Sequence, residues 1–327
     1  MAEKIWVVVQ VRDGGLHPAS REAIAGAQSM AAMAGCDVEA IALGDDLDAV
    51  GAELAALDLA CGRVLEHSAL AAYTPGGFVG CLAEAIRAHE PSLVVFSHSY
   101  QSVDYVPRLA QELGAALVPE VTSVHYEQGA WTWRRPVFAG KMVCEVKARK
   151  EGTVLATLQA GAFSADDLRS GTAPVERIEI SQAPEPDREI LGVEEVAGEH
   201  VDLSQADSIV SVGRGIGDAD KIAIVQELAS ALGAELGASR PVIDSGWLDR
   251  DRQIGSSGQV VSPKLYVAVG ISGAIQHLVG MKGSQVIVAI NKDRSAPIFG
   301  IADYGVVGDL FEIVPALTAA VREAKEG

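Results

Sequence analysis

The stretch Ser208-Ile209-Val210-Ser211-Val212-Gly213-Arg214-Gly215-Ile216-Gly217 decides the fold of the C-terminal part of this 327-residue chain. Its first five residues are mainly apolar and β-branched, which is typical of a buried strand in a parallel sheet. Three glycines follow, and the segment 221–232 then has the apolar spacing of a helix. A strand, a glycine-rich turn and a helix in this order predict a βα unit whose turn amides can face a phosphate.

The turn alone is a weak indication of phosphate binding, because its G-x-G-x-G spacing differs from the G-x-G-x-x-G of dinucleotide-binding folds. A glycine-rich turn without any ligand is the alternative. Two further strand ends favour a site: Leu265–Val269 leads into Gly270-Ile271-Ser272-Gly273, and Val286–Ile290 leads into Asn291-Lys292-Asp293. Ligands of open α/β sheets bind at the carboxyl ends of the strands. The sequence therefore predicts one crevice at which three strand ends meet.

Strands and helices alternate on both sides of this stretch. C-terminal to it we expect a helix at 273–279 and a last helix that starts at Pro315. In the N-terminal part we expect helices at 19–33 and from Pro75, and strands at 6–11, 38–43, 63–66 and 93–96. This βαβ order predicts a largely parallel sheet with helices on both faces.

From Thr122 the pattern changes to hairpin-like strands. Turn residues at Gln128-Gly129 and Glu151-Gly152 separate short β-branched and aromatic runs. We expect these runs to form an antiparallel extension of the first domain, with strands at 123–126, 131–134, 141–146 and 153–159.

An acidic segment at 178–206, which contains Pro184 and Pro186, has the composition of an exposed connector. The expected fold is therefore α/β with two domains, each a parallel sheet between layers of helices. We place the first domain at residues 1–200 and the second at 207–327.

Composition excludes several classes of protein. Lys and Arg number 26 against 44 Asp and Glu, a formal net charge of −18, so binding to nucleic acid or to anionic lipid is not expected. The four cysteines form no C-x-x-C pair, which argues against a metal site or a disulfide framework. The N-terminus carries too few apolar residues for a signal peptide or a membrane span, so we expect a cytoplasmic protein.

Two loops between the strands of the second domain add polar side chains to the predicted crevice. Ser239 and Arg240 precede Pro241, and the segment Gln253-Ile254-Gly255-Ser256-Ser257-Gly258 offers hydroxyl and amide groups. Each has a structural alternative. Arg240 could form a surface ion pair, the two serines could lie in a solvated loop, and His277 could be a packed or capping histidine.

Several ordered motifs in the second domain go beyond these general patterns. They are Gly237–Pro241, Gln253–Gly258, Leu265–Met281, Val288–Asp293, Ala296–Phe299 and Ala302–Gly305. Together they closely resemble the alpha subunit of electron transfer flavoprotein. The resemblance is strong from about residue 205 to the end. It is looser in the first domain, where the matching runs are Asp104–Ala110, Arg135–Gly140 and Gly161–Phe163.

This resemblance implies a heterodimer in which the C-terminal domain of this chain binds FAD and a beta subunit binds AMP or a second flavin. It also implies an adenine-nucleotide-hydrolase-like first domain and a doubly wound second domain. The positions that match the flavin site of the family are Arg214, Gly215, Ser239, Arg240, Gln253, Gly255, Ser256, Ser257, Gly258, Gly270, Ser272, Gly273, Gln276, His277, Asn291, Lys292 and Asp303.

Three of these residues are expected to tune the flavin. A reduced flavin carries negative charge at its N1 and C2 carbonyl edge, so Arg240 beside the ring and His277 at that carbonyl should stabilise it. Ser257 should face N5. Many members of the family have Gln-Thr where this chain has Ser256-Ser257, so the flavin-edge contact from the longer amide is expected to be absent here, whereas the hydroxyl at Ser257 remains. Ser272 and the turn amides should hold the diphosphate, and Asn291 and Asp303 the ribose or adenine side.

The expected function is electron transfer from dehydrogenases such as acyl-CoA dehydrogenase to a downstream acceptor. Whether the complex is instead an electron-bifurcating enzyme that uses NADH depends on the beta subunit. An NAD-dependent oxidoreductase is disfavoured, because no acidic residue for a ribose follows the Gly213–Gly217 turn at a convincing distance. A nucleotide-binding regulatory protein is a third alternative. The first domain offers only Gln10–Gly15 as a phosphate loop, so we expect it to pair with the beta subunit.

Overall fold

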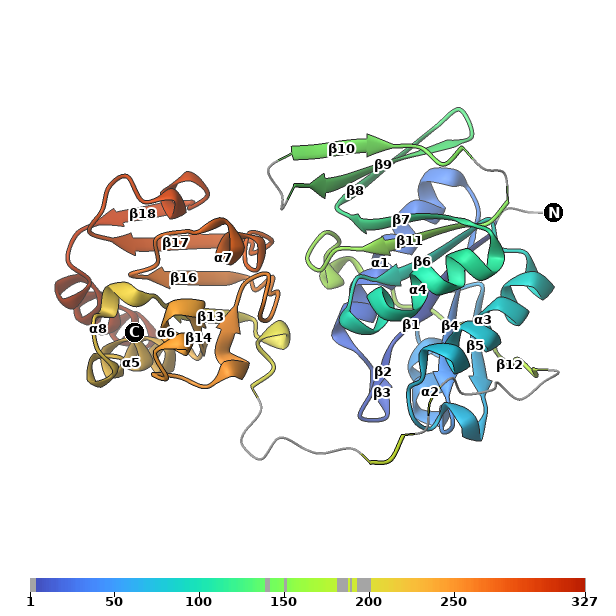
Figure 1. Ribbon diagram of the computed structural model, residues 1–327, viewed down its shortest axis with the longest axis horizontal. Coiled ribbons are helices and arrows are strands. Elements are labelled where there is room, and N and C mark those ends of the chain that lie inside the picture. Colours follow the sequence, from blue (N-terminus) through green and yellow to red (C-terminus); the bar gives the residue numbers. More distant parts are fainter. Residues whose placement is uncertain are drawn as a thin grey trace. The chain divides into compact units, whose positions relative to one another are not determined.

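The computed structural model describes residues 4–138, 142–149, 152–180, 188, 190–192 and 201–326. The chain divides into two compact units, Met1–Glu194 and Glu195–Gly327, each with its own sheet and its own core (Figure 1). Most of the connector expected at 178–206, including Pro184 and Pro186, lies outside the described residues.

The first unit contains a seven-stranded sheet in the order β12-β5-β4-β1-β6-β11-β7, in which all neighbouring strands are parallel (Figure 1). The strands are β1 (Lys4–Val9), β4 (Asp37–Gly44), β5 (Cys61–Glu66), β6 (Leu93–Ser97), β7 (Ala116–Val121), β11 (Val154–Leu158) and β12 (Val175–Arg177). The helices are α1 (Pro18–Ala34), α2 (Asp48–Ala55), α3 (Pro75–His89) and α4 (Tyr100–Leu113).

Strand β1 shows how the sheet is covered on both faces. Successive side chains of a strand point to opposite faces. Ile5 and Val7 accordingly join one buried cluster with α1 and α2, whereas Trp6 and Val8 join the other with α3 and α4. Burial on both faces explains why the strand sequence is almost continuously apolar.

A separate antiparallel sheet of three strands extends the first unit, in the order β10-β9-β8 (Figure 1). The strands are β8 (Ser123–Glu127), β9 (Ala130–Val137) and β10 (Met142–Val146). Lys141 and Glu151, at ends of the expected runs, lie outside the described residues. The assignment of 153–159 to this extension was wrong. Its residues form β11, which pairs in parallel with β6 and β7 because Leu155 and Ala156 are fully buried in the main sheet.

The second unit contains a six-stranded parallel sheet in the order β15-β14-β13-β16-β17-β18. The strands are β13 (Ser208–Val212), β14 (Glu235–Ser239), β15 (Gln253–Ile254), β16 (Leu265–Val269), β17 (Val286–Asn291) and β18 (Tyr304–Val307). Strands β14 and β15 lie on one side of β13, and the chain then crosses to the other side of β13 to form β16, β17 and β18. The topological switch point therefore lies between β13 and β16, and ligands of such sheets bind at the carboxyl ends there.

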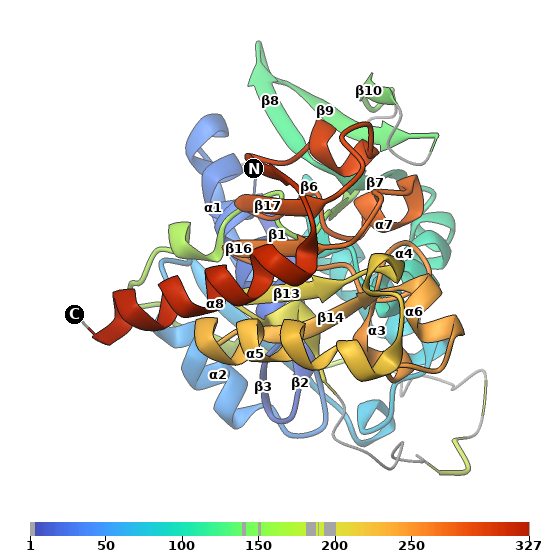
Figure 2. The same ribbon diagram turned by 90° about the vertical axis from the view of Figure 1, so that its left-hand side faces the viewer.

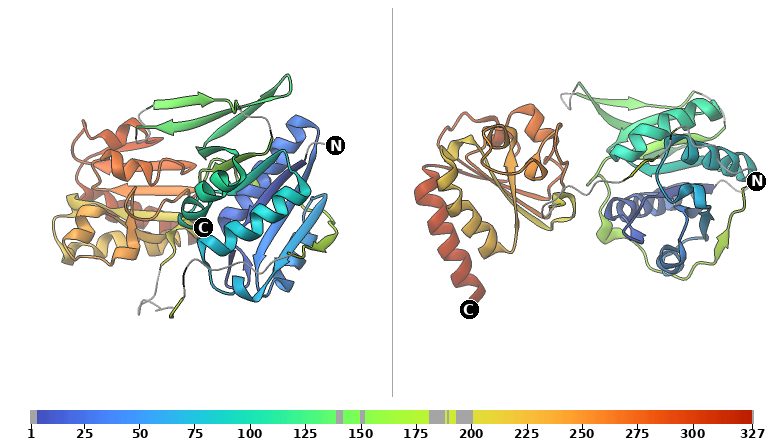
Figure 3. Two further views of the ribbon diagram at one scale, coloured as in Figure 1. Left: turned by 45° about the vertical axis from the view of Figure 1, so that its right-hand side comes forward. Right: turned by 60° about the horizontal axis from the view of Figure 1, so that its bottom comes forward.

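Four helices belong to this sheet: α5 (Ala223–Leu232), α6 (Arg240–Asp244), α7 (Ile275–Val279) and α8 (Leu310–Glu326). Helices α5 and α8 pack side by side on one face (Figures 2 and 3). The expected start of the last helix at Pro315 was wrong. The helix begins at Leu310, because the Asp309 carboxylate accepts a hydrogen bond from the Phe311 amide at 2.9 Å and caps the first turn.

Among the described residues, no helix combines the length and the apolar character that crossing a membrane requires.

Candidate functional site

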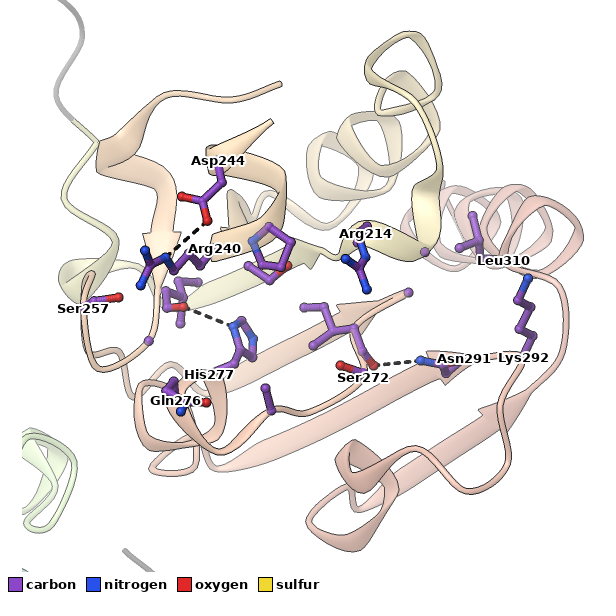
Figure 4. Close-up of a pocket in the computed structure, with 18 of the residues that line it drawn as sticks. Arg214, Arg240, Asp244, Ser257, Ser272, Gln276, His277, Asn291, Lys292 and Leu310 are labelled. Carbon is purple, nitrogen blue, oxygen red and sulfur yellow. Dashed lines mark hydrogen bonds and ion pairs between the residues drawn. The ribbon is translucent and has the colours of Figure 1, made fainter. Parts of the chain in front are cut away.

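A pocket of about 670 Å³ opens at the carboxyl edge of the second unit's sheet, at the switch point between β13 and β16 (Figure 4). This volume lies in the range of roughly 300–1,000 Å³ that is usual for ligand sites. The turn after β13 and the turn after β16 form its floor. Helix α6, the loop after β15, helix α7 and the start of α8 complete its walls.

Most of the residues expected in the crevice line this pocket. They are Arg214, Gly215, Ser239, Arg240, Gly255, Ser256, Ser257, Gly270, Ser272, Gln276, His277, Asn291 and Lys292. The structure thus brings together residues that are up to 78 positions apart in the chain, from Arg214 to Lys292. Parallel strands present their carboxyl ends at one edge, which is why separate motifs converge.

Four of the expected residues are not among the lining residues. The Asp303 carboxylate accepts a hydrogen bond from the Ile287 amide at 2.8 Å, which fixes the entry to β18. Gln253 donates to the Ser257 hydroxyl at 3.0 Å. Gly258 and Gly273 are packed against backbone, since an added Cβ would lie 2.4 Å from the Gln253 carbonyl oxygen and 2.3 Å from the Ile298 nitrogen, respectively. These four residues shape the loops around the pocket.

The glycines after β13 pack two turns against each other. A Cβ on Gly213 would lie 2.3 Å from the carbonyl oxygen of Gly270, and one on Gly215 would lie 2.8 Å from the Gly270 Cα. Gly270 itself has φ +64°, a left-handed conformation that favours glycine. The sequence predicted that a ligand approaches the backbone at Gly213, Gly215 and Gly217. Of these three glycines, only Gly215 lines the pocket.

Two cations in the pocket wall have no carboxylate partner among the described residues. These are Arg214, after β13, and Lys292, after β17, and both side chains are exposed at the pocket (Figure 4). Such groups can form charge-assisted hydrogen bonds with phosphate oxygens. Ser272, which also lines the pocket, follows β16, the strand between β13 and β17 in the sheet. This side of the pocket is suited to an anionic ligand group.

Arg240 lines the pocket and also forms an ion pair. Its Nε lies 3.2 Å from the Asp244 carboxylate, one turn further along α6, and its side chain is 66% exposed. The surface ion pair that was the alternative for Arg240 is thus present, but within the pocket wall rather than away from it (Figure 4). Asp244 offsets part of the positive charge that Arg240 brings to a ligand.

His277 is 5% exposed, and both of its ring nitrogens are engaged within the protein. Nδ1 lies 3.1 Å from the carbonyl oxygen of Ile254, and Nε2 lies 2.9 Å from the hydroxyl of Tyr266. Burial lowers the pKa of His277 to about 4, so the imidazole is neutral at pH 7. A hydrogen bond from this ring to a ligand would have to replace one of these two contacts.

The loop after β15 places two exposed hydroxyls at the other end of the pocket. The Ser256 amide donates to the carbonyl of Gln276 at 2.7 Å, which joins the loop to α7. Ser257 is the hydroxyl expected to face a flavin ring, and it borders the pocket (Figure 4).

The side chain of Asn291 forms hydrogen bonds within the protein through both of its polar atoms. Its amide donates to the Ile271 carbonyl at 2.8 Å, and its oxygen accepts from the Asp293 amide.

Nine lining residues were not expected from the sequence. They are Pro241, Asp244, Ile254, Ile271, Ala274, Gly308, Asp309, Leu310 and Phe311. Most are apolar or contribute backbone, so no side-chain chemistry marks them in the sequence. Asp244 and Asp309 are the two with charged side chains. Of these, Asp309 carried a usable signal, because an Asp before an apolar run is a helix N-cap signal that would have moved the start of α8 to the pocket.

Within the part of the chain that the structure describes, no group of three or more His, Cys, Asp or Glu side chains could hold a metal ion.

Two family models match the chain. The electron transfer flavoprotein domain matches residues 5–183, and the electron transfer flavoprotein FAD-binding domain matches residues 202–282. The second match covers β13 to α7 and so contains most of the pocket wall. The C-terminal unit is therefore an FAD-binding domain of this family.

Similar curated proteins span the whole chain. An electron transfer flavoprotein subunit alpha from Thermoanaerobacterium thermosaccharolyticum is 35% identical and covers 98% of each chain. One from Bacillus subtilis is 38% identical, covering 99% of this chain and 98% of its own. A third, from Paracoccus denitrificans, is 48% identical over 65% of this chain and 67% of its own.

Among solved structures, a putative thiamin diphosphate-dependent enzyme from Mycobacterium smegmatis matches at 15% identity, with 91% of this chain and 54% of the other covered. Its TM-score of 0.25 is too low to support any inference. The family models and the near full-length relatives agree with each other. The chain belongs to the electron transfer flavoprotein alpha subunit family.

Proposed function

We propose that this chain is the FAD-carrying subunit of a heterodimeric electron carrier, which accepts electrons from flavoprotein dehydrogenases and passes them to a downstream acceptor. The single observation that carries the proposal is the pocket at the β13/β16 switch point, because it lies largely within the matched FAD-binding region and gathers thirteen expected residues. FAD supplies the redox chemistry, since its ring system can take up and release electrons one or two at a time.

The chemistry of the pocket wall fits FAD. Arg214, Lys292 and Ser272 can hold the diphosphate, where negative charge is greatest. Ser256, Ser257 and Gln276 offer donors and acceptors to the polar edges of a flavin ring. Ile254, Ile271 and Leu310 offer apolar contacts to the flat faces of the rings.

Arg240 and His277 have different roles in this arrangement. The Arg240 guanidinium supplies positive charge at the ring end of the pocket, and this charge stabilises a reduced, anionic ligand more than an oxidised one. Asp244 moderates that effect through the ion pair. His277 is neutral and held by Ile254 and Tyr266, so it contributes a fixed wall and a dipole rather than a net charge.

We propose that the first unit pairs with a beta subunit. The relatives named above are all alpha subunits, which implies such a partner for them. The exposed apolar side chains Phe138, Met142 and Val143, at the β9 and β10 strand ends, support a protein contact on this unit. Large apolar side chains that cluster at a surface are typical of interaction sites.

The test is to purify the chain together with its beta subunit and to record the visible spectrum during titration with acyl-CoA and an acyl-CoA dehydrogenase. We expect a yellow heterodimer whose flavin bands bleach on reduction. A colourless complex, or a stable flavin-loaded monomer, would contradict the proposal. Counting flavins separates the two forms of the function: one FAD per heterodimer indicates a simple carrier, and two FAD with bleaching by NADH indicate a bifurcating enzyme.

A further inference from the structure

Tyr266 lies directly behind the pocket wall. It belongs to β16, and its side chain is fully buried among the apolar residues on the face of the sheet opposite α5 and α8. Its hydroxyl nevertheless reaches a partner, because it lies 2.9 Å from Nε2 of His277. A buried hydroxyl that finds a hydrogen bond in this way adds specificity as well as stability.

The contacts of His277 determine which ring nitrogen carries the proton. A backbone carbonyl can only accept a hydrogen bond, so Nδ1, at 3.1 Å from the Ile254 oxygen, must carry a hydrogen. In a neutral imidazole Nε2 then has a lone pair and accepts from the Tyr266 hydroxyl. The two partners thus select one neutral tautomer and one ring orientation.

Both partners remain uncharged near neutral pH. Burial raises the pKa of Tyr266 far above its usual range, so the phenol keeps its proton. Burial also lowers the pKa of His277, so the imidazole stays neutral. The Ser211 hydroxyl, buried on β13, also acts on Tyr266, and it carries no charge.

The same histidine connects the sheet to the loop that carries Ser256 and Ser257. Through Nδ1 it holds the carbonyl of Ile254, the residue two positions before Ser256. The neighbouring Gln276 carbonyl accepts from the Ser256 amide at 2.7 Å. A chain of hydrogen bonds therefore runs from Tyr266 through α7 to the loop at the expected ring end of the pocket.

We propose that Tyr266 is a positioning residue of the flavin site: its hydroxyl holds His277 as the neutral tautomer with hydrogen on Nδ1, and thereby fixes the loop at Ile254–Ser257. The inference rests on the proposed placement of FAD in this pocket. Tyr266 lies in the second layer of the wall and does not line the pocket, so it acts through His277.

The test uses the FAD-loaded heterodimer with ¹⁵N label in its histidine side chains. Comparison with His277→Gln identifies the signals of His277. In the native complex we expect one protonated and one unprotonated ring nitrogen, with the proton on Nδ1, at pH 6 to 8. A proton on Nε2, or a doubly protonated ring in this pH range, would overturn the proposal. This outcome is read from the native complex and does not depend on the folding of the Tyr266 variant.

Tyr266→Phe keeps the ring and removes only the hydroxyl. We expect one of two changes in the ¹⁵N signals of His277: the unprotonated nitrogen loses the chemical-shift change caused by its hydrogen bond, or the proton moves to Nε2. We also expect the Kd for FAD to rise about threefold to tenfold, where tenfold corresponds to about 1.4 kcal/mol. Tyr105→Phe is the matched control, because Tyr105 is equally large and buried but belongs to the first unit. It should change neither quantity.

Unchanged ¹⁵N signals of His277 in Tyr266→Phe would also overturn the proposal. A purely structural role would lower the free energy of unfolding without moving these signals. Failure of the proposed electron transfer would be seen separately, as absence of reduction by any dehydrogenase, and would leave the tautomer of His277 unaffected.

Discussion

The two units of this chain are built on the same kind of sheet but differ at the edge where ligands usually bind. Both sheets are parallel, and both have a switch point beside the first strand: β1/β6 in the first unit and β13/β16 in the second. In the second unit this edge opens into a pocket of about 670 Å³. In the first unit the cavity near β6 measures only about 10 Å³, enough for one water molecule.

The turns after the first strands explain the difference. After β13 the chain makes a glycine turn that packs on the turn after β16, and the pocket opens above both. After β1 it makes a small hairpin of β2 (Val11–Arg12) and β3 (Gly15–Leu16), with Asp13 and Gly14 in left-handed conformations. This hairpin folds back on itself and offers no phosphate loop.

Side chains then fill the first unit's crevice. His98, after β6, forms a hydrogen bond of 2.8 Å with the Thr157 hydroxyl, and Phe163 lines the remaining small cavity. Glu22 accepts a hydrogen bond from the Gly161 amide at 2.7 Å, and burial raises the pKa of its carboxyl. A shared fold class therefore does not imply a shared site, because turns and side chains decide whether the edge stays open.

The largest expected effect comes from adding a side chain between the two glycine turns, where their backbones are in close contact. Gly213→Ala places a Cβ against backbone atoms of Gly270, and overpacking of this kind costs about 1–3 kcal/mol. We expect the Kd for FAD to rise by up to roughly 100-fold in equilibrium dialysis. Gly14→Ala is the control in the first unit. It has open space around it, so it should cost about 1 kcal/mol for its positive φ and leave FAD binding intact.

A smaller effect is expected from pH. The pKa of His277 falls from 6.5 in the unfolded chain to about 4 in the folded one, so the unfolded state binds more protons below pH 6.5. Stability from this group is complete above pH 6.5 and is lost as the pH falls towards 4. Between pH 7 and pH 5 the loss should be about 2 kcal/mol.

Denaturant titration of the native chain and of His277→Gln at both pH values measures this contribution. The variant should lose about 2 kcal/mol less than the native chain over the same interval. His125→Gln, a change at an exposed histidine of β8, should retain the native pH dependence. If the free energy of unfolding changed equally between pH 7 and pH 5 in the native protein and in His277→Gln, His277 would not be a buried, neutral histidine.

The next effect concerns two arginines at corresponding places in the two sheets. Arg214 follows β13 and lines the pocket, whereas Arg12 follows β1 in the hairpin, 3.6 Å from the Asp13 carboxylate. Arg214→Ala should raise the Kd for FAD about tenfold, because one charge-assisted hydrogen bond to phosphate is lost. Arg12→Ala should leave the Kd unchanged. Equal effects of both changes would remove Arg214 from the site.

The smallest expected effect is on redox potential. Arg240→Ala should leave FAD bound but lower its one-electron potential by less than about 60 mV. A tenfold change in the equilibrium constant of a one-electron reduction corresponds to 59 mV. The effect stays below this value because Asp244 already offsets part of the charge of Arg240. Arg240→Lys should recover part of this change. Asp244→Asn should move the potential in the opposite direction. A spectroelectrochemical titration measures all three, and an unchanged potential in Arg240→Ala would place Arg240 outside the reach of the ring.

Apolar periodicity was sufficient to predict most strands and the two-domain α/β organisation. It did not predict α4 or β7, and it misplaced β11, because a short apolar run reads the same in a hairpin as in a parallel sheet. Strand β14 was missed since Gly237 and Ser239 weaken its β-propensity. The misplacement of β11 concerns tertiary pairing, which local sequence does not contain.

Most of the candidate site was predictable, because its polar residues follow strand ends and match specific motifs. The Tyr266–His277 contact and the Arg240–Asp244 ion pair were not, since each depends on how a side chain orients within the fold. The expected contact of Asp303 with the ribose or adenine side stays a prediction. Its position matched the family motif, but its carboxylate caps the Ile287 amide and does not line the pocket.

Hydrogen–deuterium exchange of the heterodimer, with and without FAD, tests the difference between the two units most directly. FAD should slow exchange in the second unit's pocket segments at 213–217, 253–258, 270–277 and 308–311. It should leave the corresponding segments of the first unit, 10–17 and 97–99, unchanged. Protection of 10–17 and 97–99 by FAD, or the absence of protection in the second unit, would contradict the assignment of the flavin site to the β13/β16 edge.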